Sequence, residues 1–212
     1  MRITRLVATG LALALLVPAL AQAQEGRRFT DSWFWGIKAA NMSYWSTSGE
    51  EGQAQGIGGE WLITKTRAAL LIGAERYSFG DVYDFDDTEA SSIDGKPVAM
   101  TNMTRIAVTL LAFPKSIGGL RPYAGIGFAY NRIDAEAVTE GELTEGQVAD
   151  ASMNIAPTFM GGLQAQYRRF SVFGQATLQA SRNNGFLLSG NEAYFLEGGI
   201  RYNFGSAVEE YR

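Results

Sequence analysis

The stretch Asn191–Phe204, NEAYFLEGGIRYNF, decides how the rest of the chain is interpreted. From Tyr194 onward every second residue is apolar, aromatic or small, and from Glu197 onward the residues between them are polar or glycine. This period of two predicts a strand with two different faces. A face that carries Glu197 and Arg201 suits the inside of a membrane barrel, whose apolar side chains point outward to lipid. The alternative, on this stretch alone, is an amphipathic strand of a soluble β-sandwich.

Alternation of this kind recurs along the chain and predicts eight strands, each longer than ten residues. Strands of globular proteins average about 5 to 6 residues, whereas a tilted strand that crosses a bilayer needs about 9 to 11. The pattern therefore predicts an all-β fold, a closed antiparallel eight-stranded up-and-down transmembrane β-barrel. The first strand is placed mainly on composition and length. The predicted strands are Trp33–Trp45, Gln53–Ile63, Arg67–Phe79, Met100–Phe113, Arg121–Ile133, Ala151–Tyr167, Phe170–Ser181 and Asn191–Phe204.

The connections alternate as regularly as the strands. Those after the second, fourth and sixth strands are short and basic, whereas those after the third and fifth, Gly80–Pro97 and Asp134–Asp150, are long and acidic. Short turns on one rim and long loops on the other are typical of outer-membrane barrels, whose short turns are periplasmic. A soluble sandwich gives no reason for loop length and charge to separate in this way.

The N-terminus has the pattern of a secretory signal peptide. Arg2 and Arg5 form a basic region, Leu6–Leu20 is an apolar core, and Ala21-Gln22-Ala23 has the small residues of a cleavage site. The sequence thus predicts a signal peptide over residues 1–23, a barrel domain over 24–204 and a short periplasmic tail over 205–212. Export through a cleaved signal peptide follows from this prediction.

Composition excludes several classes of function. The chain contains no cysteine and no histidine, so it has neither disulfides nor the commonest general base and zinc ligand. Loss of Arg2 and Arg5 with the signal peptide would change the formal net charge from −4 to −6, which argues against nucleic acid as a partner. We therefore expect no catalytic residues, no cofactor and no enzymatic activity.

The mature chain resembles the small eight-stranded outer-membrane β-barrels of Gram-negative bacteria, the OmpA/OmpX/OmpW-like superfamily. Its last strand matches the assembly signal of that family, with Glu197 as the polar residue, Gly199 as the glycine, and Tyr202 and Phe204 as the two aromatics. One departure is that the chain continues past Phe204 with GSAVEEYR. The resemblance implies a monomer in the cell outer membrane, in contact with membrane lipid and lipopolysaccharide, and recognised by the barrel-assembly machinery.

Six charged residues are predicted to point into the barrel. Three are acidic and three basic, and in a lumen with room only for side chains we expect them to form ion pairs and fill the space. A catalytic carboxylate pair is the alternative, but glycosidase chemistry needs an open cleft. The predicted lumen network consists of Lys38, Glu60, Glu75, Arg105, Glu197 and Arg201.

The predicted function is non-enzymatic, either structural in the envelope or a surface interaction through the acidic loops. The alternative is binding or passage of a small hydrophobic molecule, which an apolar lining near Met103, Met160 and Phe173 would favour. For the acids of Asp81–Glu89 three interpretations stay open: they hold calcium, they bridge through divalent cations to lipopolysaccharide phosphates, or they keep the loop solvated. Aromatics fall near expected strand ends, and those that face lipid are predicted to form interface girdles. The strand-end aromatics are Trp33, Trp35, Trp45, Phe113, Tyr167, Phe170, Tyr202 and Phe204.

Overall fold

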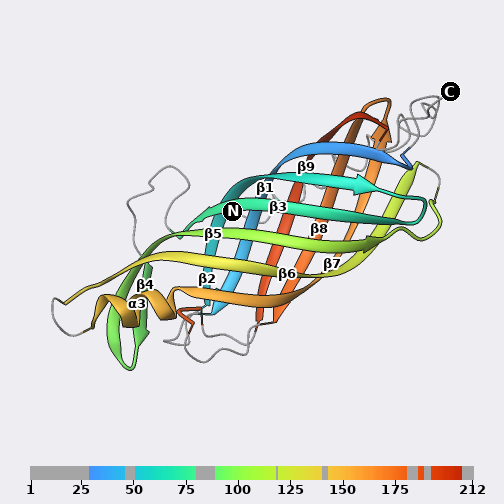
Figure 1. Ribbon diagram of the computed structural model, residues 1–212. Helices are drawn as coiled ribbons and strands as arrows, with labels where there is room; N and C mark the ends of the chain where they lie inside the picture. The colour runs from blue at the N-terminus through green and yellow to red at the C-terminus, as the bar shows by residue number, and fades with distance from the viewer. Residues whose placement is uncertain are drawn as a thin grey trace.

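Eight long strands close into an antiparallel barrel (Figure 1). The computed structural model describes residues 29–45, 51–79, 89–117, 119–139, 143–180, 186–188 and 192–206. Neighbouring strands pair in chain order, and β1 pairs with β9. The fold class predicted from the sequence is confirmed. The barrel strands are β1 (Ser32–Trp45), β2 (Glu51–Thr64), β3 (Ala68–Ser78), β5 (Lys96–Ala112), β6 (Leu120–Ala137), β7 (Met153–Tyr167), β8 (Phe170–Ala180) and β9 (Glu192–Ser206).

Two further elements lie in segments that were predicted from the sequence to be loops. Strand β4 (Glu89–Ile93) forms a hairpin with the start of β5, and helix α3 (Glu145–Ala151) precedes β7. The hairpin turns at Asp94-Gly95, where both residues have positive φ, as a tight two-residue turn requires. The helix begins at a capping box, in which the side chains of Thr144 and Gln147 each accept a hydrogen bond from the other's backbone N–H. The prediction of irregular loops was therefore wrong at these positions.

The two rims of the barrel differ. We call the rim with the β2–β3, β5–β6 and β7–β8 connections the turn end, and the opposite rim the loop end. Beyond the loop end, β5 and β6 continue past the other strands and carry β4 and α3 beside them (Figure 1). We call this projection the surface lobe: β4, Lys96–Met100 of β5, Ile133–Ala137 of β6, and α3.

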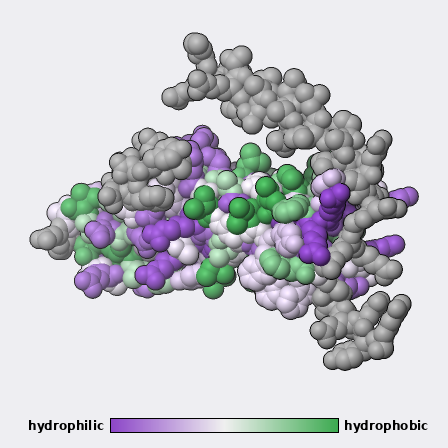
Figure 2. Space-filling view, turned by 90° about the horizontal axis from the view of Figure 1, so that it is seen from above, coloured by the Kyte–Doolittle hydropathy of each residue, from purple (hydrophilic) through white to green (hydrophobic). Residues whose placement is uncertain are grey.

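The outer wall of the barrel is apolar and its inner wall is mixed. Outward side chains such as those of Ile37, Ile57 and Leu196 are 73%, 67% and 68% exposed, whereas their sequence neighbours are mostly buried inside. Figure 2 shows the apolar residues gathered over the middle of one face, with hydrophilic residues toward both ends. The same alternation holds in β1, the strand whose faces the sequence did not separate.

Closure of the barrel depends on β1 and β9, as predicted. Their register pairs Lys38 with Gly199 and Ile37 with Ile200, and one irregularity occurs between Trp33 and Phe34.

Within the described part of the chain, no helix has the length and apolar character needed to span a membrane.

Most of the strand-end aromatics lie on the outer wall, but Phe113 does not. Trp35 is 52% exposed and stacks on Trp61, with ring centroids 5.4 Å apart. Phe113 is only 8% exposed and packs edge-on against Phe29 inside the turn end. Phe113 continues the alternation of β5, in which Leu111 and Phe113 are buried and Ala112 between them is exposed. Phe113 therefore lies on the same inward face of the pattern as Arg105, not among the aromatics that face lipid.

Two apolar clusters occupy the ends of the interior. The turn-end core contains Phe29, Phe34, Leu62, Ala69, Leu71, Leu111, Phe113, Tyr123 and Met160. The loop-end core is larger and includes lumen residues as well as the segment Phe186–Leu188, which lies between β8 and β9 in the chain. Its buried members are Ala40, Met42, Tyr44, Ala54, Tyr77, Phe79, Val98, Met100, Met103, Ile133, Ala151, Phe186, Leu187, Leu188, Ala193 and Phe195.

Candidate functional site

Between the two apolar cores, all six predicted lumen charges come together. They project from five strands: Lys38 from β1, Glu60 from β2, Glu75 from β3, Arg105 from β5, and both Glu197 and Arg201 from β9. Each is at most 5% exposed. The period-two pattern put five of them on the inner face, whereas Lys38 belongs to the strand whose faces the sequence did not separate. In the structure all six side chains are buried inside the barrel.

Lys38 is the centre of this ion cluster. Its Nζ lies 2.6 Å from Glu75 Oε1, 2.8 Å from Glu197 Oε1 and 3.7 Å from Glu60 Oε2. Arg105 Nη1 lies 2.8 Å from Glu75 Oε2, and the Nε of Arg201 donates to Glu60. Three acids and three bases thus form one connected, electrically balanced group, which is the condition under which buried charges are tolerated.

Neutral polar side chains complete the cluster, and the sequence analysis did not single them out as members of it. Gln175 donates from Nε2 to Glu197 Oε2 at 2.6 Å, and its Oε1 accepts from Tyr123 OH at 2.8 Å. Arg201 donates from Nη1 to Gln164 Oε1 at 2.7 Å. The Arg201 guanidinium also lies over the Phe173 ring, 3.8 Å from its centroid. All of these residues lie on inward faces of the period-two pattern, which is the signal that marked them as lumen residues.

Glycines opposite the charges provide the space that the long side chains occupy. Gly36 pairs with both Glu60 and Arg201 across its two neighbouring strands. A Cβ at Gly36 would lie 2.9 Å from Arg201 Cγ and 3.1 Å from Glu60 Cγ. At Gly58, an added Cβ would lie 2.8 Å from Glu75 Cγ. A larger residue at either position would displace the cluster.

The charged groups of the ion cluster bond to one another inside the barrel. Its carboxylates are buried and already engaged by bases or amides, so a substrate has no access to them. Within the described residues, no group of three or more potential metal ligands occurs. The cluster fills the middle of the lumen, as eight-stranded barrels require of their interior side chains.

The three residues expected to line an apolar tunnel are separated. Met103 belongs to the loop-end core and Met160 to the turn-end core, while Phe173 lies against Arg201 in the ion cluster. The three do not line one continuous passage, because the ion cluster lies between the two cores.

The residues of the predicted assembly signal lie toward the turn end of β9. A Cβ at Gly199 would lie 2.2 Å from the backbone oxygen of Ile37, so only glycine fits against β1 there. Tyr202 packs edge-on against both Phe170 and Phe204, with centroids 5.1 and 5.0 Å away. Phe204 is 62% exposed on the outer wall. Its role in recognition by the assembly machinery stays a prediction.

At the loop end, the segment Phe186–Leu188 folds over the interior. The Leu187 N–H donates to the Ala151 oxygen at 3.0 Å, and Ser91 Oγ donates to the Leu187 oxygen at 2.9 Å. These bonds connect the segment to α3 and β4. The surface lobe and the cover of the barrel mouth are therefore one packed unit.

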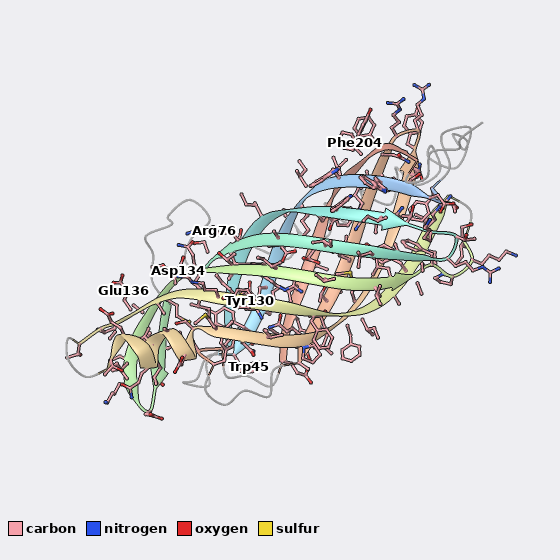
Figure 3. The ribbon with its side chains drawn as sticks, in the orientation of Figure 1. Trp45, Arg76, Tyr130, Asp134, Glu136 and Phe204 are labelled. Atoms are coloured by element: carbon pink, nitrogen blue, oxygen red, sulfur yellow. The ribbon has the colours of Figure 1, made fainter. Side chains whose placement is uncertain are left out.

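Part of the predicted acidic loops belongs to the surface lobe. Asp134 and Glu136 lie on β6 and Glu145 lies on α3. Asp134 Oδ2 lies 3.5 Å from Arg76 Nη2 of β3, and Figure 3 shows these two residues and Glu136 on the lobe side, at the opposite end from Phe204. Of the predicted cation-binding stretch, residues 81–88 lie outside the described residues.

A groove of about 830 Å³ opens in the lobe between α3 and the outer ends of β5 and β6. Its lining combines apolar residues of α3, such as Val148 and Ala149, with the acids Asp134, Glu136 and Glu145. A second hollow, of about 450 Å³, lies at the outer wall over β7, β8 and β9 and is lined by Phe159, Leu178 and Leu196 among others. The sequence predicted neither hollow, because both are formed by residues of several elements whose relative positions depend on strand register.

Comparisons with known proteins agree on the architecture. No protein-family model matches the chain, and no curated protein matches it. The solved structure of Neisserial surface protein A (NspA) is similar, with 14% identity, a TM-score of 0.55, and coverage of 81% of this chain and 97% of that one. The structure of Ail, the attachment invasion locus protein of Yersinia pestis, is similar at 9% identity and a TM-score of 0.54, covering 83% of this chain and 100% of that one. The chain therefore has the fold of the small eight-stranded outer-membrane β-barrel proteins.

Proposed function

We propose that this chain is a non-enzymatic outer-membrane protein whose filled barrel anchors the surface lobe at the cell exterior, where the lobe contacts another macromolecule. One observation carries the proposal: the lumen is occupied by buried charges between two apolar cores, while a structured lobe projects beyond one rim. A filled interior leaves the outer surfaces as the parts that can act. The apolar outer wall suits a lipid environment.

Similar solved proteins give further support. Ail is described as an attachment invasion locus protein and NspA as a surface protein, so the fold is compatible with display at a cell surface. The long loops and the lobe share one rim, which in outer-membrane barrels is the outer one. By the same reasoning, the basic turn end faces the periplasm and lipopolysaccharide surrounds the loop end.

Single-cysteine labelling tests this orientation directly, since the chain has no cysteine of its own. Glu136→Cys places a thiol on the surface lobe, and Lys115→Cys places a matched thiol on an exposed turn. In intact cells a membrane-impermeant maleimide should label the first variant, and it should reach the second only after the outer membrane is permeabilised. Labelling in the reverse order, or recovery of the protein as a soluble periplasmic chain, would refute the proposal.

Delivery to the outer membrane is proposed to depend on the assembly signal at the end of β9. Phe204→Ala should lower the fraction of chain that reaches the outer membrane, whereas Phe159→Ala, a change of equal size on the outer wall of β7, should lower it less. Outer-membrane fractionation with a heat-modifiability gel measures this fraction. Equal yields for the two variants would remove the special role of the β9 terminus.

A second candidate is the binding of a small hydrophobic molecule in the loop-end core. The observation that favours it is the segment Phe186–Leu188, whose apolar side chains fill space that an apolar ligand could take. The ion cluster closes the floor of this space, so the geometry supports binding rather than passage. Leu187→Ala should increase the fluorescence of N-phenyl-1-naphthylamine added to the folded protein. No change in probe binding would eliminate this candidate, and single-channel recordings should be silent in either case.

A further inference from the structure

Strand β6 runs past the end of its pairing with β7. The last β6–β7 pair is Arg132↔Met153, whereas β6 stays paired to β5 on its other edge as far as Ala137. The Ile133 N–H still donates to the Ser152 oxygen, at 2.8 Å, where the chain passes from α3 into β7. Beyond Ile133, no strand of the described chain pairs with this edge. We call it the open edge.

The backbone groups of Ala135 and Ala137 face the open edge. Along a strand, the N–H and C=O of one residue point to the same edge, and those of the next residue point to the opposite edge. Ile133 bonds on the open side, and the Val138 N–H bonds on the β5 side, to the Pro97 oxygen at 3.2 Å. Ala135 and Ala137 therefore point the same way as Ile133. Such edge groups are a template for an added strand.

The groove of about 830 Å³ lies along this edge. Its volume falls within the range of about 300 to 1,000 Å³ that ligand sites occupy. Val148 and Ala149 of α3 form the wall opposite the edge, and Ala135 and Ala137 line it on the strand side. At about 3.3 Å per residue, the edge from Ile133 to Ala137 accommodates an extended segment of about four or five residues.

The rim of the groove is acidic. Glu136 and Glu145 are exposed, and within the described residues neither forms a salt bridge. Asp134 is paired with Arg76, and Arg132 is the basic residue of the lining. The surplus negative charge lies beside backbone donors and acceptors, so a partner that satisfies both must be extended and basic.

We propose that the open edge binds an extended, basic segment of a partner protein, which adds to the sheet of the surface lobe as a short strand. This inference rests on the proposed function, because the lobe must face outward to meet a partner. Anionic polymers are disfavoured by the acidic rim. A second copy of this chain is disfavoured as well, because edge-to-edge pairing would bring the Glu136 carboxylates of the two copies together.

The test uses the full folded protein in detergent micelles and a fluorescent ten-residue peptide that alternates lysine and valine. We expect this peptide to bind, and its glutamate–valine counterpart and oligolysine to bind at least about tenfold more weakly, because the first has the wrong charge and the second has no apolar face. Methylation of the backbone nitrogens on one edge of the lysine–valine peptide should abolish binding. Methylation on the other edge should leave it, since only one edge pairs with β6.

Variants of the protein supply the matching measurement. Ala135→Pro removes an N–H on the open edge and leaves the β5 ladder intact, because that ladder uses Asp134 and Glu136. The expected loss of affinity is about five- to tenfold, the effect of about one net hydrogen bond. Glu145→Gln should weaken binding about threefold, whereas Glu51→Gln, an exposed acid outside the groove, should not. A heat-modifiability gel confirms that each variant is folded.

Two results would overturn the inference: no binding of the lysine–valine peptide, or equal binding of oligolysine with no effect of N-methylation. The second would reduce the site to a diffuse acidic patch. If Ala135→Pro fails to fold, the two methylated peptides still decide the question on the unaltered protein. Should Glu136→Cys be labelled on intact cells while the peptide fails to bind, the inference is wrong and the proposed function stands. If Glu136→Cys is not labelled on intact cells, both the inference and the proposed function are wrong.

Discussion

Replacing Lys38 by methionine should destabilise the barrel more than any single change at its surface. Methionine keeps the length of the apolar stem but removes the ammonium, whose Nζ lies within 2.8 Å of both Glu75 and Glu197. The cluster then holds three carboxylates and two guanidinium groups in a space that water does not reach. Breaking a buried ion pair by removing one partner costs about 3 to 5 kcal/mol in free energy of unfolding.

The cost can be assigned to a particular carboxylate. After loss of Lys38, Glu75 keeps Arg105 at 2.8 Å and Glu60 keeps Arg201. Glu197 keeps only Arg105 at 4.0 Å and the neutral donors of Gln175 and Thr177. If Glu197 is neutralised as well, the double variant should lose less free energy of unfolding than the two single variants lose together. The difference should exceed about 2 kcal/mol, which is within the range of coupling found for directly interacting residues.

The four proteins to compare are the unaltered chain, Lys38→Met, Glu197→Gln and the double variant. Urea unfolding in lipid vesicles, followed by the gel shift of the folded barrel, measures the free energy of unfolding of each. Lys65→Met is the matched control, because Lys65 makes an exposed salt bridge to Asp31 at 3.1 Å that should contribute less than about 1 kcal/mol. A Lys38→Met barrel as stable as Lys65→Met would refute the reasoning. So would a double variant, Lys38→Met with Glu197→Gln, whose loss equals the sum of the single losses.

Three further changes test other parts of the structure. Gly58→Ala places a Cβ 2.4 Å from the nearest backbone oxygen and should cost about 1 to 3 kcal/mol in the urea assay, whereas Gly174→Ala, with no atom within 4 Å, should be close to neutral. Ile57→Arg puts a charge on the middle of the outer wall and should cost about 2 to 4 kcal/mol in vesicles, compared with little for Ile57→Val; an equal effect would argue against a lipid-facing wall. Thr144→Ala removes the capping box of α3 and should cost that helix about 1 kcal/mol, seen as faster hydrogen exchange at the Val148 amide, and unchanged exchange would contradict the cap.

The sequence was sufficient to predict the barrel because two environments act on every strand. The outer wall is exposed and apolar, while the inner wall must be packed. Along the middle of β2 and β9, side chains therefore alternate between more exposed and more buried positions without exception. That alternation is local, and it can be recognised one strand at a time. Even β1, whose faces did not separate in the sequence, was placed by its composition and length.

Local signals for β4 and α3 were also present but were outweighed by charge. Asp94-Gly95 separates two short runs and is a strong hairpin signal, and Thr144 with Gln147 three residues later has the spacing of a capping box. Both lie in segments rich in acids, which favoured the interpretation as solvated loops. The packing of Phe186–Leu188 into the loop-end core had no such signal, because it depends on contacts with residues distant in the chain.

The candidate site divides in the same way. Five of the six lumen charges were predictable because each lies on the inward face of a clearly alternating strand, while Lys38 depended on the placement of β1. The contributions of Gln164, Gln175 and Gly36 were not predictable from the sequence. They depend on the register between strands, which determines the residues that lie opposite one another. The open edge of β6 depends on where β7 begins, which is another property of register rather than of local pattern.

The ion cluster also follows from the route that an outer-membrane chain must take. If the protein is exported as we propose, every strand passes the inner membrane before it folds, where about 20 consecutive apolar residues would be retained as a spanning helix. An interior of aliphatic side chains would fill the lumen equally well, but it would make both faces of each strand apolar. Charged side chains fill the same volume and interrupt β9 at Glu197 and Arg201. The pairing seen around Lys38 then offsets the cost of burying them once the barrel has closed. On this reasoning the ion cluster meets two requirements: the unfolded chain must pass the inner membrane, and the folded barrel must have a filled lumen.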